Sequence, residues 1–174
     1  MDGALADALR LVREVADFPE PGVLFRDINP VLADPTAFRT LVDVMATGVP
    51  SGTDAVAAIE ARGFVLGAAV AYALGVGLVC VRKPGKLPAV DHRVDYGLEY
   101  GTATLELPSG AVRPGQRLVI VDDVLATGGT AAAARHLVDS AGGVVTGVSV
   151  ILEIVALVGR DRLDGLTVTA LARV

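Results

Sequence analysis

Short β-branched segments alternate with alanine-rich segments over most of this chain, and the alternation predicts strands and helices in turn. Helices are predicted over 64–74 and 130–141. Strands are predicted over 55–59, 78–82, 102–107, 117–122, 144–152 and 166–171. Because segments such as Leu118-Val119-Ile120-Val121 are apolar throughout, they suit a parallel sheet covered on both faces. The pattern therefore predicts an α/β fold with a doubly wound, mostly parallel sheet flanked by helices.

The N-terminal part of the chain has helical spacing. Leu5, Leu9, Val12 and Ala16 recur at helical intervals and predict one amphipathic helix, which ends before the prolines within 17–22. A second helix is predicted after Asp34-Pro35, where an N-cap residue precedes a proline at the first helical position. Phe38, Leu41, Val42 and Met45 form the apolar face of that second helix.

One long stretch, 84–101, shows no clear periodicity and is predicted to be a loop. Loops of this length are usually lids or binding loops rather than plain connectors. In open α/β sheets the ligand lies beyond the carboxyl ends of the strands, so we expect the site there.

Size and charge narrow the class of protein. A chain of 174 residues is predicted to form one domain. A Cys/His zinc site is excluded, because two histidines and the single Cys80 cannot supply four ligands. The net charge of −5 argues against electrostatic binding to nucleic acid. A lone cysteine is consistent with a reducing cytoplasm, and Asp2, Asp7 and Arg10 stand where an export signal would be apolar.

The uncharged run Phe64–Val81 has the minimum length of a membrane span. Gly75 and Gly77 interrupt it, and the sequence changes there from alanine-rich to β-branched. We therefore predict a buried helix, a glycine stop and a buried strand, with a membrane span as the alternative.

The segment Arg117–Thr130 carries the clearest chemistry. A buried strand delivers Asp122 and Asp123 at its carboxyl end, and the small-residue turn Ala126-Thr127-Gly128-Gly129-Thr130 then opens a helix. Glycine backbone amides and a helix N-terminus form a phosphate site. Two carboxylates beside it would repel a polyanion unless they met sugar hydroxyls or a magnesium ion. The segment therefore predicts a site for a phosphorylated ribose.

Other interpretations of this segment are weaker. A P-loop requires lysine before the final threonine, where this chain has Gly129, and the dinucleotide fingerprint of spaced glycines is absent. The non-functional alternative is a tight turn whose acidic residues cap the following helix.

Five motifs occur in the order in which one known family carries them: 17–30 (DFPEPGVLFRDINP), 60–64 (EARGF), 81–88 (VRKPGKLP), 97–102 (GLEYGT) and 119–130 (VIVDDVLATGGT). Together they resemble the type I phosphoribosyltransferase family, in the form of its adenine-using branch, over residues 17 to about 163. Asn29 and the stretch 89–96 depart from the family pattern.

The resemblance implies transfer of 5-phosphoribosyl from phosphoribosyl pyrophosphate to adenine, which gives AMP and pyrophosphate. It also implies Mg²⁺ held mainly by the donor substrate, near Asp122 and Asp123 if near protein side chains at all, and a homodimer.

The resemblance also implies roles for individual residues. Residues 1–34 would form a first helix and a base-binding hood, and residues 83–101 an active-site lid. Glu99 would handle a proton on adenine, while Arg62 and Lys83, with Lys86, would neutralise the leaving pyrophosphate. The remaining implied substrate-binding residues are Leu24, Phe25, Arg26, Glu60, Ala61, Tyr100, Asp122, Asp123, Ala126, Thr127, Gly128, Gly129 and Thr130. The resemblance further implies that the turn at Glu60–Ala61 meets pyrophosphate, in this family often through a cis peptide.

Two other functions fit parts of the pattern. One is a phosphoribosyltransferase for 6-oxopurines, although such enzymes usually carry an acid where this chain has Ala126. The other is a non-catalytic module that senses phosphoribosyl pyrophosphate, although only about sixteen residues precede the matched region.

Overall fold

The computed structural model describes residues 3–97 and 101–174, which divide into two compact units, one up to Val44 and one from Met45 onward. The first unit holds α1 (Gly3–Leu9), a hairpin of β1 (Arg13–Ala16) and β2 (Leu24–Asp27), α2 (Asn29–Ala33) and most of α3 (Pro35–Thr47). Whether the chain acts as one domain stays a prediction.

The prediction of a single first helix reaching Ala16 was wrong. The helix ends at Leu9, and residues 13–16 instead form an antiparallel strand against β2, with Ala16 opposite Leu24. Charged pairs cross this hairpin: Arg13 bonds Asp27 at 2.5 Å, and Glu14 pairs with Arg26. Partners more than ten residues away therefore override the local helical spacing.

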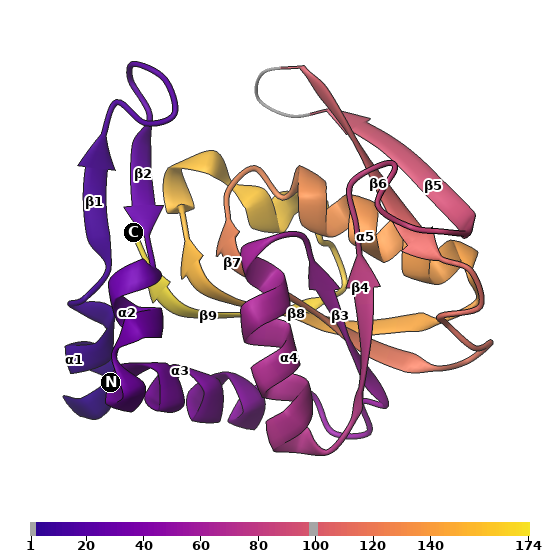
Figure 1. The fold of residues 1–174 in the computed structure, drawn as a ribbon, viewed down its shortest axis with the longest axis horizontal. Coiled ribbons are helices and arrows are strands. Elements are labelled where there is room, and N and C mark those ends of the chain that lie inside the picture. Colours follow the sequence, from indigo (N-terminus) through magenta and orange to yellow (C-terminus); the bar gives the residue numbers. More distant parts are fainter. Residues whose placement is uncertain (1–2, 98–100) are drawn as a thin grey trace. The chain divides into compact units, whose positions relative to one another are not determined.

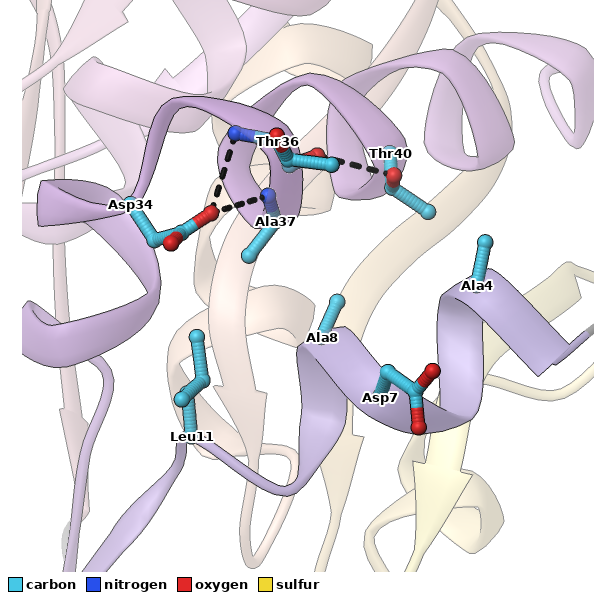
Figure 2. A pocket seen from close by; sticks show the side chains of 8 residues that line it. All are labelled: Ala4, Asp7, Ala8, Leu11, Asp34, Thr36, Ala37 and Thr40. Atoms are coloured by element: carbon cyan, nitrogen blue, oxygen red, sulfur yellow. Dashed lines mark hydrogen bonds between the residues drawn. The ribbon is translucent and has the colours of Figure 1, made fainter.

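The predicted N-cap at Asp34 is confirmed. Its Oδ1 accepts hydrogen bonds from the backbone N–H groups of Thr36 (3.0 Å) and Ala37 (2.8 Å), and Pro35 begins α3 (Figure 2). These bonds satisfy amides that a helix leaves without partners in its first turn.

The second unit is built on a five-stranded parallel sheet in the order β4-β3-β7-β8-β9 (Figure 1). Its elements, in chain order, are β3 (Ala55–Ile59), α4 (Arg62–Leu74), β4 (Gly77–Val81), β5 (Val90–Gly97), β6 (Thr102–Pro108), β7 (Arg117–Leu125), α5 (Gly129–Ser140), β8 (Val144–Glu153), two short 3-10 helices η1 (Val155–Leu157) and η2 (Gly159–Arg162), and β9 (Thr167–Arg173). The predicted fold class is confirmed.

The sheet is covered on both faces, as its apolar strands require. Along β3, Ala57 and Ile59 belong to the same core cluster as Ala134 and Leu137 of α5. The alternate residue Ala58 faces α4, where a Cβ added at Gly67 would lie only 2.5 Å from the Ala58 Cβ. Because successive strand residues point to opposite faces, the two helices cover opposite sides of β3.

Two further predictions were tested by this unit. The run 64–81 is a helix, a left-handed stop at Gly75 (φ 68°) and a strand, as predicted. In the described residues, no helix has the length and apolar character needed to cross a membrane.

The predicted loop at 84–101 was wrong in part, because 90–97 form β5, which pairs with β6 in an antiparallel hairpin. The half-buried His92, Val94 and Tyr96 alternate there with exposed charged residues, a period-two pattern that a polar histidine obscures.

Candidate active site

The carboxyl ends of three neighbouring strands carry most of the predicted site residues. β4, β3 and β7 are adjacent and parallel, so their carboxyl ends lie along one edge of the sheet. Beyond these ends come, in turn, the basic turn Lys83–Lys86, the turn Glu60-Ala61-Arg62, and the Ala126–Thr130 loop. Basic side chains, carboxylates and a glycine-rich turn that are far apart in the chain therefore meet at one edge.

The acid pair, Asp122 and Asp123, lies within β7 rather than after it. β7 continues to Leu125, and Asp122 pairs with Val150 of β8. The Asp123 side chain is only 6% exposed, and its Oδ2 lies 2.7 Å from Nε of Arg62. A Cβ at Gly63 would lie 2.8 Å from the Val121 carbonyl oxygen, so glycine lets the start of α4 approach this strand. The close approach brings Arg62 onto the acid pair.

Asp122 differs electrostatically from its neighbour. Burial, followed by the negative charge of Asp123, raises the pKa of the Asp122 carboxyl well above its usual range. The backbone N–H of Asp123, which donates to Asp122 Oδ1 at 2.9 Å, and the Arg62 charge oppose that shift. The Asp123 carboxylate is thus paired with the Arg62 guanidinium, whereas the Asp122 carboxyl lies in surroundings that make its ionisation costly.

The loop Ala126–Thr130 leads directly into the N-terminus of α5. Gly128 adopts a left-handed conformation (φ 80°) and is the N-cap of α5, a twelve-residue helix whose dipole favours an anion at this end. Thr130 Oγ1 lies 3.4 Å from the Tyr96 hydroxyl of β5. The predicted residues of this loop therefore lie where an anion would meet a helix N-terminus.

Gly159 supports this loop and was missed by the sequence analysis. A Cβ on Gly159 would lie 2.2 Å from the Ala126 carbonyl oxygen, and one on Gly128 would lie 2.2 Å from the Gly159 carbonyl oxygen. The backbones of η2 and the loop therefore touch directly. A lone glycine in a Val-Gly-Arg-Asp stretch gave no signal of this contact.

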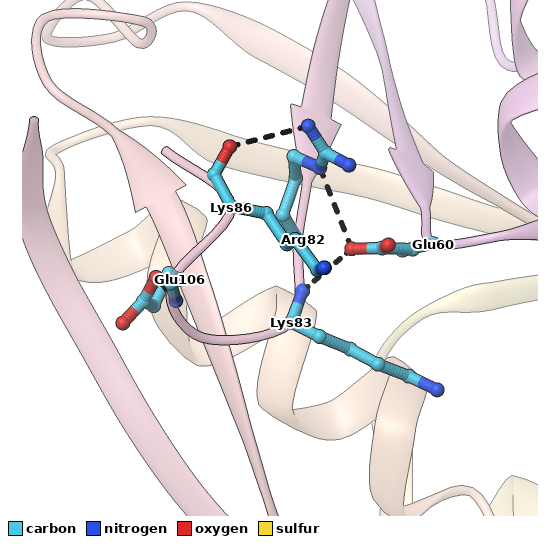
Figure 3. A network of polar contacts seen from close by, with 6 residues as sticks. Glu60, Arg82, Lys83, Lys86 and Glu106 are labelled. Carbon is cyan, nitrogen blue, oxygen red and sulfur yellow. Dashed lines mark hydrogen bonds and ion pairs between the residues drawn. The ribbon is translucent and has the colours of Figure 1, made fainter. Parts of the chain in front are cut away.

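The basic turn is held by polar contacts (Figure 3). Glu60 Oε2 accepts the Lys83 backbone N–H at 2.8 Å and lies 3.4 Å from Nε of Arg82. The Lys83 hydrogen bond and the Arg82 charge lower the pKa of the Glu60 carboxyl. Arg82 Nη1 donates to the Lys86 carbonyl at 3.2 Å, while Figure 3 shows the Lys83 side chain extending away from this network. The Glu60–Ala61 peptide is cis, as the resemblance implies.

The predicted base-binding residues belong to the first unit. Leu24, Phe25 and Arg26 lie on β2. The Phe25 ring meets Phe18 edge-on, with the ring centroids 5.0 Å apart. A separate pocket of about 360 Å³ lies between α1 and the start of α3 and contains no predicted site residue (Figure 2).

Two predicted residues, Glu99 and Tyr100, lie outside the described residues. Within 3–97 and 101–174, no group of three or more histidine, cysteine, aspartate or glutamate side chains is arranged to hold a metal ion.

A parallel sheet with a glycine-threonine phosphate loop, an acid pair and basic turns at its carboxyl edge defines a phosphoribosyl-binding α/β domain. The phosphoribosyl transferase domain family matches residues 41–162. An adenine phosphoribosyltransferase of Saccharopolyspora erythraea is 58% identical over 98% of this chain and 93% of its own length. A solved adenine phosphoribosyltransferase of Thermoanaerobacter pseudethanolicus superimposes with a TM-score of 0.95 at 48% identity, over 98% of this chain and 99% of its own.

A Saccharomyces cerevisiae adenine phosphoribosyltransferase, solved with adenine and an imino-altritol bisphosphate, has a TM-score of 0.90 at 34% identity, over 99% of this chain and all of its own. The chain belongs to the adenine phosphoribosyltransferase family.

Proposed function

We infer that this chain is a pentosyltransferase that moves 5-phosphoribosyl from phosphoribosyl pyrophosphate to adenine and forms AMP and pyrophosphate, a purine-salvage reaction. The observation that carries this conclusion is the shared edge of the sheet, where Arg62, the acid pair and the phosphate loop meet in a chain of this family. The activity requires a phosphate site, acceptors for the ribose hydroxyls and positive charge for the leaving pyrophosphate. The helix N-terminus at Gly128, the acid pair and the basic residues at this edge are groups of these three kinds.

In the proposed mechanism, the loop Ala126–Thr130 binds the 5′-phosphate, and the carboxylates of Asp122 and Asp123 accept hydrogen bonds from the ribose hydroxyls. A ring nitrogen of adenine attacks the anomeric carbon as the bond to pyrophosphate breaks. Arg62, Lys83 and Lys86 stabilise the negative charge of the leaving group. These residues act mainly by electrostatics and positioning.

The base is recognised, in this proposal, by Leu24, Phe25 and Arg26 of β2, with Phe25 against the ring and the backbone of its neighbours reading the exocyclic amine. Glu99 takes the proton that adenine loses, and Tyr100 orders the lid 83–101. Lid closure would exclude water, which otherwise hydrolyses the donor.

Mg²⁺ fits this edge as a metal carried by the substrate. Magnesium is commonly held by one or two carboxylates together with substrate phosphates, and the acid pair offers such carboxylates. When bound, the ion would supply positive charge at the pyrophosphate. A single cysteine supports a cytoplasmic location, which we propose as well.

We further propose a homodimer formed through α4. Val65 is 47% exposed and Tyr72 is 91% exposed, and they lie seven residues apart with the exposed Ala68 between them, so they share one helix face. Leu78 on the edge strand β4 is also exposed at 40%. Exposed apolar side chains gathered in this way are typical of a protein interface.

The activity is tested by incubating the protein with phosphoribosyl pyrophosphate and Mg²⁺ and with adenine, hypoxanthine, guanine or xanthine separately. We expect AMP and pyrophosphate from adenine alone. Conversion of a 6-oxopurine in place of adenine would contradict the assignment. Tight donor binding with no turnover would instead indicate a sensing module.

A further inference from the structure

Glu106 is a buried charged residue that the proposed mechanism does not use. It lies in β6 and is only 5% exposed. A buried carboxylate is costly unless hydrogen bonds or an opposite charge compensate it. Its partners among the described residues are the backbone N–H of Gly85, 3.2 Å from Oε2, and the guanidinium of Arg93, whose Nη1 lies 3.7 Å from Oε1.

Gly85 is part of the basic turn, and little besides hydrogen bonds holds that turn in shape. The residues Lys83 to Lys86 are all exposed, and Gly85 has a left-handed backbone (φ 75°) with no atom within 4 Å of an added Cβ. Glu60 fixes the first amide of the turn and Arg82 its last carbonyl. The Glu106 carboxylate fixes the amide in between.

The same residue joins the turn to the β5–β6 hairpin. The main chains of Glu106 and Arg82 exchange two hydrogen bonds, of 2.9 and 2.7 Å. Arg93, which faces the carboxylate, belongs to β5. Glu106 is therefore itself part of the hairpin, where Arg93 is its cross-strand partner. Its backbone pairs with Arg82, directly before the turn, and its side chain contacts the turn at Gly85.

We propose that Glu106 is a positioning residue that holds the Lys83–Lys86 turn in the shape that binds pyrophosphate. This inference rests on the proposed function, which places pyrophosphate at this turn. Glu106 acts through the Gly85 amide and is not itself in contact with substrate. Its loss should therefore weaken binding of pyrophosphate and of the pyrophosphate-bearing donor, and leave adenine binding intact.

The test compares three variants in steady-state kinetics and in pyrophosphate titrations. Glu106→Ala removes the acceptor, and Glu106→Asp keeps the charge but shortens its reach. Both should raise the donor KM and the pyrophosphate Kd by about 5- to 30-fold, the effect of one or two kcal/mol, while the adenine KM changes less than about twofold. Glu106→Gln retains an oxygen for the Gly85 amide and should bind nearly as the parent does.

The matched control is Asp54→Ala. Asp54 also accepts a backbone N–H, that of Arg117 at 2.9 Å, but it precedes β3 and so lies at the opposite edge of the sheet. This variant should leave the donor KM unchanged.

Unchanged donor and pyrophosphate affinity in Glu106→Asp or Glu106→Ala would overturn the inference, and so would equal losses in Glu106→Gln and Glu106→Ala. The double variant Lys83→Ala/Lys86→Ala distinguishes a failure of the proposed function from a failure of the role of Glu106. If this double variant binds pyrophosphate as the parent does, the placement of pyrophosphate at this turn is wrong. If it binds pyrophosphate weakly while Glu106→Ala and Glu106→Asp bind it as the parent does, only the role of Glu106 is wrong.

Discussion

Asp122 and Asp123 are neighbours in the chain, yet their carboxylates are held differently. Asp123 pairs with Arg62, whereas burial and the charge of Asp123 raise the pKa of Asp122. In the proposed mechanism the ionised form of Asp122 accepts hydrogen bonds from ribose hydroxyls, yet its surroundings disfavour ionisation. Such conflicts between stability and chemistry are typical of functional sites.

The double variant Asp122→Asn/Asp123→Asn should raise the KM for phosphoribosyl pyrophosphate by at least about tenfold, because each charge-assisted hydrogen bond contributes about 1.5–3 kcal/mol. The adenine KM should change little. Steady-state kinetics with each substrate varied in turn measures both. A double variant that turns over as well as the parent would show that the acid pair does not hold the donor.

Asp122→Asn alone should make the folded protein more stable at pH 7. A carboxyl whose pKa is raised on folding contributes stability below its unfolded pKa, and that contribution is lost as the pH rises through the folded pKa. Asparagine is never ionised, and its Oδ1 can still accept the Asp123 N–H. Thermal unfolding at several pH values should show a higher Tm for the variant at pH 7, by about 2–4 °C per kcal/mol. The advantage should disappear near pH 3.

Glu99→Gln should lower kcat at least about tenfold, since a general base contributes about 10²–10⁴-fold. Donor affinity should stay within about twofold, which separates a role in proton transfer from one in binding. Product formation at saturating adenine and donor is the measurement. An unchanged kcat would remove Glu99 from the chemistry.

At the scale of elements, η2 links the sheet to the phosphate loop. Arg160 in η2 donates from Nε and Nη2 to the two oxygens of the buried Glu153, at 2.7 Å each, and from Nη1 to the Val168 carbonyl of β9. Gly159, the preceding residue, then meets the loop backbone. The ion pair and the glycine contact together fix where the loop lies on the sheet.

Gly159→Ala should raise the donor KM about 5- to 30-fold, which corresponds to a loss of about one or two kcal/mol in donor binding. The added Cβ would collide with the Ala126 carbonyl and displace the loop Ala126–Thr130. Gly77→Ala is the matched control, since a Cβ at Gly77 meets only the Ala55 Cβ at an ordinary 3.8 Å. Donor affinity measured in both variants decides the matter. Equal, unchanged values would contradict a supporting role for η2.

Glu153→Gln should destabilise the protein by about 1–3 kcal/mol at pH 7, because Arg160 and Arg173 would lose a buried anionic partner. The Arg160 hydrogen bonds lower the pKa of Glu153, so its contribution is present above the unfolded pKa and is lost as the pH falls through the folded pKa. Urea unfolding should therefore show the difference shrinking below about pH 4. Asp139→Asn, which removes the exposed pair with Arg135, should cost under about 0.5 kcal/mol and serves as the control.

At the scale of the whole molecule, the proposed dimer places the exposed face of α4 in an interface. Tyr72→Glu, alone and with Val65→Glu, should convert the dimer to a monomer in sedimentation or light scattering, because a charge at the centre of an apolar interface is poorly solvated. His136→Glu, on an exposed position of α5, is the control and should leave the mass unchanged. A parent chain that is monomeric at micromolar concentration would refute the dimer.

The sequence by itself determined the elements whose signals are local. The strand at 55–59 is apolar throughout, the cap at Asp34 needs only the next three residues, and the stop at Gly75 needs only a glycine. The acid pair and the glycine-threonine turn likewise stand together in the chain. The α/β fold could therefore be predicted, and so could the candidate-site residues that are neighbours in the chain.

Only the tertiary structure decided the features that depend on distant partners. Residues 13–16 became a strand because β2 pairs with them, and 90–97 became a strand because β6 does. Glu60 and Glu106 hold a turn more than twenty residues away in the chain, and Gly159 meets a loop about thirty residues before it. Side-chain and backbone contacts of this kind arise from packing across the sheet, and no local pattern of residue types encodes them.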